Sequence, residues 1–158
     1  MSIFDHINLS TIKKIQLERP GVRVACCEWM VELLHGIRNI DVLQIGKLYD
    51  YGNFKLSPCK LYHDVPNCGW RIFKEETKIF HATDTQHLQG ILAKGYDLYS
   101  IEANYDETTI WDIIREKEMR GEFSHERGSI NSHLSEQQAV DFFISNKKET
   151  SRLIRLHE

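Results

Sequence analysis

The sequence predicts a single α+β domain over residues 1–158, with helices flanking a split, mostly antiparallel sheet. Three observations favour this class. Apolar residues recur with helical spacing in the first forty residues, alternating and aromatic segments begin at Asp41, and strand-like and helix-like segments then follow in an irregular order. We therefore expect a helical N-terminal part, residues 1–40, that packs on an α+β core, residues 41–158.

The composition is typical of a folded globular chain. The 158 residues are 41% hydrophobic and 10% aromatic, which is enough to build a core. The formal net charge of -3 provides no overall positive field, so a nucleic-acid partner is not expected. The sequence contains neither an apolar run of membrane-spanning length nor a secretory signal at its start. We expect a protein that acts in the cytoplasm where it is made, or that enters a host cell without a cleaved signal peptide.

The first predicted helix follows Pro20 and Gly21. Between Val22 and Ile37 the apolar residues recur at a spacing near 3.6, which is typical of a helix with one buried face. From Asp41 onward, short β-prone runs separated by turn residues indicate a hairpin or meander. These runs are residues 42–49, 51–53, 54–56, 59–62, 70–73 and 77–80.

A short helix is predicted directly after the last of these runs. Asp84 or Thr85 can accept the free backbone N–H groups at its start, and Gly95 is a typical stop signal at its end. Another helix is expected from about Glu107 to Arg120, where apolar residues are followed by a strongly charged stretch.

The C-terminal segment predicts a strand, a helix and a second strand. Residues 130–134 have the pattern of a strand, and the spacing of Ser135 and Gln138 is typical of a capping box that opens a helix. Residues 152–156 alternate charged and apolar side chains and are expected to form a terminal strand.

The candidate site lies where the predicted strand 77–80 leads into its helix. His81 and Thr83 are two positions apart, and side chains at that spacing lie on the same face of a strand. Both groups could therefore reach one ligand. An imidazole can donate to or accept from a sugar hydroxyl, so this pair suits a polar ligand.

The segment Phe80-His81-Ala82-Thr83 and its helix resemble the ADP-ribosyltransferase fold, in the branch typified by diphtheria toxin and the poly(ADP-ribose) polymerases. The resemblance covers about residues 78–100 and, more loosely, 130–146. It implies an ADP-ribosyltransferase-like domain that uses NAD as a substrate and transfers ADP-ribose to a host or target protein. A bacterial toxin or effector, or a phage protein, is the implied setting.

The resemblance also implies roles for the first motif. His81 would orient the ribose of NAD, and Thr83 would help to place the nicotinamide. Ala82 stands where the family often has glycine. Tyr96 is one of the tyrosines that could stack on the nicotinamide ring.

The later motifs imply the remaining site residues. Ser132 and Ser135 stand at the position of the second motif. The third motif needs a carboxylate that stabilises the positive charge developing on the ribose, and Glu126 and Glu158 are the candidates. A plainer interpretation is also open, in which His81 is a hydrogen-bonded structural residue and Ser135 only caps a helix.

The four cysteines predict neither a disulfide framework nor a metal site. Cys26 and Cys27 are adjacent, and no C-x-x-C spacing occurs, so reduced thiols are expected. A zinc site built from Cys59, Cys68 and His63 would match no standard ligand pattern.

Two alternative functions stay open at this point. Cys26 or Cys27 near the start of a helix could pair with His81, or with His63 and Asp64, in a Cys-His hydrolase or deamidase. Alternatively, the aromatic segment 49–73 could form the binding surface of a non-catalytic interaction module. The acceptor molecule and the oligomeric state cannot be predicted from the sequence.

Overall fold

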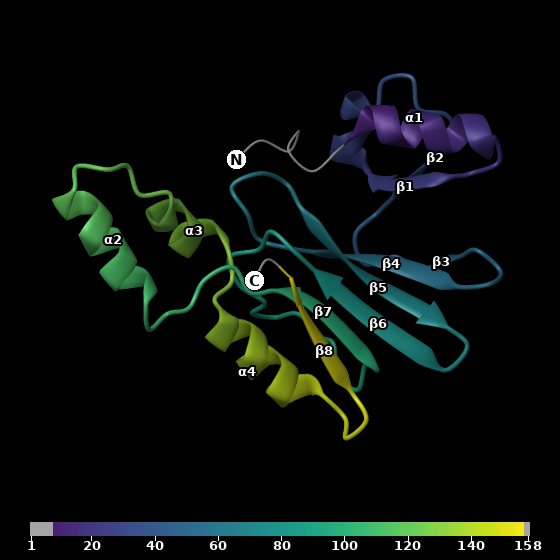
Figure 1. Ribbon diagram of the computed structural model, residues 1–158. Helices are drawn as coiled ribbons and strands as arrows, with labels where there is room; N and C mark the ends of the chain where they lie inside the picture. The colour runs from purple at the N-terminus through teal and green to yellow at the C-terminus, as the bar shows by residue number, and fades with distance from the viewer. Residues whose placement is uncertain (1–7, 157–158) are drawn as a thin grey trace.

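A six-stranded mixed sheet forms the centre of the protein, which we describe from a computed structural model over residues 8–156 (Figure 1). The strands in their order across the sheet are β3 (Tyr49–Asp50), β4 (Lys55–Lys60), β5 (Cys68–Lys74), β6 (Thr77–Ala82), β7 (Leu98–Glu102) and β8 (Arg152–Leu156). Pairing is antiparallel from β3 to β6 and parallel from β6 to β8. The α+β class is confirmed, and the sheet is mixed.

A smaller unit precedes this sheet. It consists of α1 (Leu9–Glu18), β1 (Val24–Cys27), the 3₁₀ helix η2 (Glu28–Leu33) and β2 (Ile40–Leu43). β1 and β2 form a separate two-stranded parallel sheet with its own apolar cluster. In Figure 1 this unit lies above β3 and β4 of the large sheet. Trp29 of η2 lines a pocket together with Val65 and Pro66 of the loop between β4 and β5.

Along the sequence, three helices separate β7 from β8. They are α2 (Ile110–Met119), α3 (Glu126–Ser132) and α4 (Glu136–Asn146). None of the helices in residues 8–156 combines the length and the apolar character that a membrane crossing needs.

The main core lies between one face of the large sheet and α4. Alternation along β6 and β7 directs Phe80, Ala82, Tyr99 and Ile101 to this face, and each has a relative exposure of 0%. Ala139 of α4 is equally buried in the same cluster. Burial of apolar side chains between sheet and helix is therefore the main stabilising contribution in this part of the fold.

Several predicted elements are confirmed. α2 lies within the predicted segment 107–120, and β8 coincides with the predicted strand 152–156. The capping box is present, since the Ser135 side chain accepts from the Gln138 backbone while the Gln138 side chain accepts from the Ser135 backbone. These elements have local signals that tertiary contacts do not override.

The predicted helix between Val22 and Ile37 is wrong. Val24 to Cys27 instead form β1, which pairs in parallel with β2, and a 3₁₀ helix follows. The apolar residues that suggested a helix are also buried by a strand followed by a 3₁₀ helix, because Cys26, Leu34 and Ile37 pack together in the small cluster. Pairing with Ile40–Leu43, which periodicity within one segment cannot reveal, decides the outcome.

Two further predictions in the second half are wrong. The segment after Asp84 forms no regular helix, because the Thr85 hydroxyl donates to the His87 carbonyl at 3.0 Å and Gly90 is left-handed with a φ of 78°. Residues 130–134, expected as a strand, supply the end of α3 and the turn into α4. Strand β7 was not predicted at all.

Strands β5 and β6 approach closely at Gly69. A Cβ atom added there would lie 2.7 Å from the carbonyl oxygen of His81, which is backbone and cannot move aside cheaply. We expect Gly69→Ala to lower the free energy of unfolding by about 1–3 kcal/mol, measured by urea denaturation. Gly128→Ala in α3 is the matched control, since nothing lies within 4 Å of its added Cβ. Equal effects of the two substitutions would contradict the close contact.

Candidate metal centre

Four polar side chains meet at one edge of the large sheet. β4, β6 and β7 run in the same direction, so their carboxyl ends share this edge. His63 follows β4, Asp84 follows β6, and Glu102 is the last residue of β7. His133 ends α3 and comes from the opposite side. Loops beyond the carboxyl ends of parallel strands are a common position for binding sites.

Asp84, Glu102 and His133 form a compact group. Each offers a possible ligand atom, and these atoms all lie within 4.8 Å of one another. Nδ1 of His133 is 2.9 Å from Oε2 of Glu102 and 3.8 Å from Oδ1 of Asp84. Within residues 8–156 this is the group of histidine, cysteine and acidic side chains that has the spacing of a metal site.

Glu102 holds this group together from a fully buried position. Its exposure is 0%, and Oε1 accepts backbone N–H groups from Thr85 at 2.6 Å and Leu134 at 3.2 Å. Oε2 pairs with Nδ1 of His133. This hydrogen bond raises the pKa of His133 above its ordinary value although burial opposes the shift. A carboxylate that binds one ring nitrogen orients the other toward a metal, so Glu102 has the features of an orienting residue.

Asp84 is held in an uncommon backbone conformation. Its φ is 53°, in the left-handed region that residues with a Cβ seldom adopt. The Asn67 side-chain amide donates to the carbonyls of Thr83 at 2.9 Å and Asp84 at 2.7 Å, which fixes this turn. Strained backbone of this kind clusters at functional sites. The Asp84 side chain remains 19% exposed beside His133.

His63 adds a second imidazole to the group. Its side chain is 5% exposed, and its ring meets that of His133 edge-on with centroids 5.3 Å apart. Nδ1 of His63 lies against the Asp64 carboxylate, whereas Nε2 is buried and has no hydrogen-bond partner among residues 8–156. A buried nitrogen without a hydrogen-bond partner is costly, so the His63 ring, which meets the His133 ring, is suited to binding a ligand.

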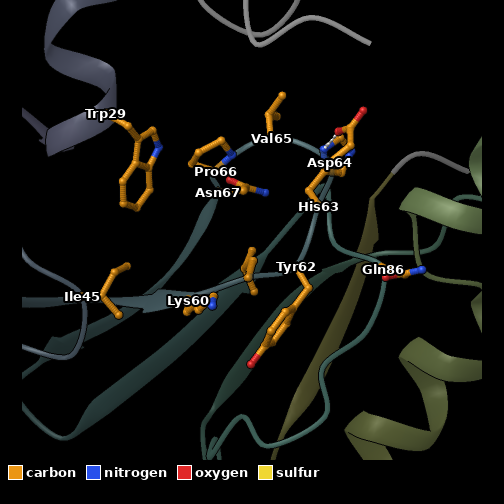
Figure 2. A pocket seen from close by; sticks show the side chains of 11 residues that line it. Trp29, Ile45, Lys60, Tyr62, His63, Asp64, Val65, Pro66, Asn67 and Gln86 are labelled. Carbon is orange, nitrogen blue, oxygen red and sulfur yellow. Dashed lines mark ion pairs between the residues drawn. The ribbon is translucent and has the colours of Figure 1, made fainter.

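A hollow opens next to His63. It has a volume of about 550 Å³, and Figure 2 shows His63 and Asp64 at one side of it and the Trp29 indole at another. Its walls are largely apolar and aromatic, with the side chains of Ile45, Lys60, Leu61, Tyr62, Val65, Pro66, Asn67 and Gln86 completing them. A molecule bound in this hollow would lie next to the His63 imidazole.

The donor set suits a transition-metal ion. Two imidazoles and one carboxylate are the ligands of catalytic zinc and non-haem iron sites that keep open positions. His63, His133 and Asp84 would be the ligands, and Glu102 would act behind His133. The unpartnered Nε2 of His63 shows that the residues present fit such an ion. The thiols considered for zinc, Cys59 and Cys68, lie outside this group.

The residues singled out at strand β6 separate onto different sides of the sheet. His81 is half-buried, its Nδ1 lies 3.1 Å from the Ser100 hydroxyl, and burial lowers its pKa. Ala82 lies in the core on the opposite face. Tyr96 is in that core as well, 6% exposed and packed on Phe80. His81 and Tyr96 therefore cannot line one pocket.

Thr83 and the two serines lie closer to the metal group. Thr83 directly precedes Asp84, and its carbonyl accepts from Asn67. The Ser132 hydroxyl donates to the Gly128 carbonyl within α3, and Ser135 caps α4. Each serine therefore already has a structural partner.

The two candidate carboxylates are not part of the group. Glu126 pairs with Lys117 and accepts from Ser124, and these contacts lower its pKa to about 2. This pair links α3 to α2. Glu158 lies outside the described residues.

Glu102 was not predicted as a site residue. Asp84 was predicted only as a helix cap, and His63 and His133 were not predicted to lie together. A usable signal was present, since Asp84 and Glu102 each stand at the end of a β-prone segment. Recognising it requires β7, which was not predicted.

The fold is similar to those of several solved structures. The metallo-beta-lactamase fold protein YhfI from Bacillus subtilis matches 96% of this chain with a TM-score of 0.66 and 14% identity. Human tRNase Z, short form, matches 94% with a TM-score of 0.62 and 17% identity. CmlA, a diiron beta-hydroxylase from Streptomyces venezuelae, matches 97% with a TM-score of 0.60 and 13% identity. No protein-family model and no curated protein sequence matches the chain.

The chain therefore has the metallo-beta-lactamase fold. It spans 61% of the length of YhfI and 65% of that of the human tRNase Z. The resemblance to ADP-ribosyltransferases is wrong, and so are the inferences drawn from it: NAD as a substrate, ADP-ribosyl transfer and a toxin or effector role. The physical reason is local, because β6 carries His81 but ends before Thr83, and no helix directly follows it.

The Glu102–His133 pair gives a measurable titration. We expect Glu102→Gln to lower the pKa of His133 in metal-free protein, because the largest cause of its upward shift is removed while burial remains. In the wild type a raised pKa means that this pair stabilises the fold below about pH 6.5, and that its contribution is lost as the pH rises through the folded pKa. Nuclear magnetic resonance titration of the histidine rings measures the pKa.

Glu126→Gln serves as the matched control for this titration. It also removes a carboxylate, but that carboxylate pairs with Lys117 and should leave His133 unchanged. An unaltered pKa of His133 in Glu102→Gln would contradict the hydrogen bond.

Proposed function

We propose that this protein is a metal-dependent hydrolase, with a transition-metal ion bound by His63, Asp84 and His133. The observation that carries the proposal is the buried Nε2 of His63, which has no hydrogen-bond partner in residues 8–156 and belongs to a ring that meets the His133 ring edge-on. The fold supports it as well. YhfI is named for the metallo-beta-lactamase fold, and the human tRNase Z has the same architecture.

The residues around the ligands have separable tasks. Glu102 holds Nδ1 of His133, so the other ring nitrogen is free to bind metal in a fixed orientation. Asp64 contacts Nδ1 of His63 in the same way, although its side chain is 58% exposed and the contact is correspondingly weaker. Asn67 keeps the Asp84 turn in its left-handed conformation.

The expected chemistry follows from the ion and from the hollow. A bound divalent ion supplies Lewis-acid chemistry, which polarises a carbonyl or phosphoryl oxygen and makes water more acidic. The hollow beside His63 offers room for a substrate, and its apolar and aromatic walls would exclude part of the water. The proposal covers hydrolysis of an ester or amide, and the substrate is left to experiment.

Metal binding is the first test. We expect zinc or manganese to raise the melting temperature of metal-free wild type, because an ion that binds only the native state stabilises it. His63→Ala, His133→Ala and Asp84→Asn should each abolish this rise. Glu102→Gln should weaken binding by about 10–100-fold, as is typical of residues that orient a ligand.

Two control substitutions make the metal titration specific. His125→Ala removes an exposed histidine away from the group and should bind as wild type does. Asp84→Asn keeps the size of the side chain, and asparagine tolerates the left-handed region, so its loss of binding would reflect the missing charge. Unchanged binding in all three ligand variants would contradict the site.

Hydrolysis is the second test. Metal-loaded protein should cleave at least one chromogenic substrate from a panel of carboxylic esters, amides, phosphomonoesters and phosphodiesters. A chelator should abolish the activity, and added metal should restore it. His125→Ala should retain activity, and Asp84→Asn should lose it. Tight metal binding without cleavage of any substrate would leave a structural metal site and overturn the hydrolase proposal.

A further inference from the structure

Two thiols meet where the small N-terminal unit contacts the large sheet. Cys27 is the last residue of β1, and Cys68 is the first residue of β5. The Sγ–H of Cys27 donates to Sγ of Cys68 across 3.5 Å, although 41 positions separate them in the sequence. Cys27 is 1% exposed, whereas Cys68 is only partly buried.

This contact joins two separately packed parts of the protein. The small unit has its own apolar cluster around Cys26, Leu34 and Ile37, and the large sheet packs on α4 through a second cluster. A covalent link between Cys27 and Cys68 would therefore attach one cluster to the other. It would close a long loop of the unfolded chain, and such links restrict the unfolded state most.

We propose that Cys27 and Cys68 are a modification site that forms a reversible disulfide, with a peroxide as the oxidant. With a peroxide, the sulfur of the more exposed Cys68 attacks an oxygen and the O–O bond breaks, which gives a sulfenic acid and releases water or an alcohol. The sulfur of Cys27 then attacks the Cys68 sulfur and expels water. The two thiols lose two electrons and two protons in total, and the peroxide takes up both.

The site has a direct structural neighbour in the loop that precedes β5. The backbone N–H of Cys68 donates to Oδ1 of Asn67 at 2.8 Å, and the Asn67 side-chain amide holds the Thr83 and Asp84 carbonyls. The disulfide would thus anchor the residue next to Asn67. The disulfide itself does not depend on the proposed metal site.

The surroundings of the thiols predict slow oxidation. Burial raises the pKa of Cys27 and of Cys68, and the neighbouring thiol raises that of Cys68 further. The reactive thiolate is therefore scarce at neutral pH, so the rate should increase in alkaline buffer.

Cys26 and Cys59 provide matched controls. Cys26 adjoins Cys27 in the sequence but packs in the small cluster, and Cys59 is buried beside Gly69 of β5. Cys26 lies in β1 with Cys27, and Cys59 lies in β4, which pairs with β5. Neither is the hydrogen-bond partner of Cys68. Cys26→Ser and Cys59→Ser should leave the link intact.

The experiment is peptide mapping of the whole protein in metal-free buffer, before and after hydrogen peroxide. Cleavage by trypsin after Arg23, Arg38, Lys55, Lys60 and Arg71 places Cys68 in peptide 61–71 and Cys59 in peptide 56–60. Cys26 and Cys27 share peptide 24–38, so the Cys26→Ser variant distinguishes them. We expect oxidised wild type and oxidised Cys26→Ser to contain peptide 24–38 joined to peptide 61–71, with the loss of two hydrogens. Dithiothreitol should separate the two peptides.

The melting temperature gives an independent measure. Oxidation should raise that of wild type by on the order of 10 °C, and Cys59→Ser should show the same rise. Cys68→Ser should show none. A link that persists in Cys68→Ser, a link that uses Cys59, or four free thiols after prolonged oxidation at alkaline pH would overturn the proposal. A link through Cys26 would overturn it as well. Fragmentation of the linked wild-type peptides tells Cys27 from Cys26, so a variant that fails to fold does not prevent the test.

Discussion

The buried carboxylate of Glu102 is the interaction around which the site end of the fold is arranged. It receives the backbone N–H of Thr85 after β6, the backbone N–H of Leu134 before α4, and the ring of His133. Two segments that are distant in sequence, one at Thr85 and one at His133 and Leu134, thus converge on one side chain with 0% exposure. A buried charge is tolerated only when its hydrogen-bonding capacity is satisfied, so the positions of these segments depend on one another. Loss of this carboxylate would release the loop that carries Asp84 as well as His133.

How much of this could be predicted depends on where each signal lies. The capping box at Ser135 and the charged amphipathic stretch of α2 are complete within a few residues, and both elements were predicted correctly. The segment that forms β1 has apolar residues at helical spacing. Its partner strand β2 is distant in the sequence, since the paired residues Val24 and Ile40 are sixteen positions apart. Strand β7 is short and its site-end residue is acidic, so its sequence gave little sign of a buried central strand.

The site illustrates the same limit. His81 and Thr83 attracted attention because a strand places them on one face, and a family resemblance supplied a role for them. The candidate metal group instead uses residues that lie at the ends of strands. Asp84 and Glu102 come together there only once the order and direction of the strands are known. The position of the candidate site therefore depends on which strand ends share an edge of the sheet, and polar residues close together in one segment did not predict it.

The charge balance of the site depends on Glu102 and His133. A positive partner favours the Glu102 carboxylate in its dry position, and the hydrogen bond to this carboxylate raises the pKa of His133. In the proposed site, an ion bound by the other nitrogen of His133 would supply this positive charge in place of a proton, so proton and metal would compete for one histidine. The carboxylate behind it already has its three hydrogen bonds without an ion, so the groups around Glu102 would be preorganised for binding.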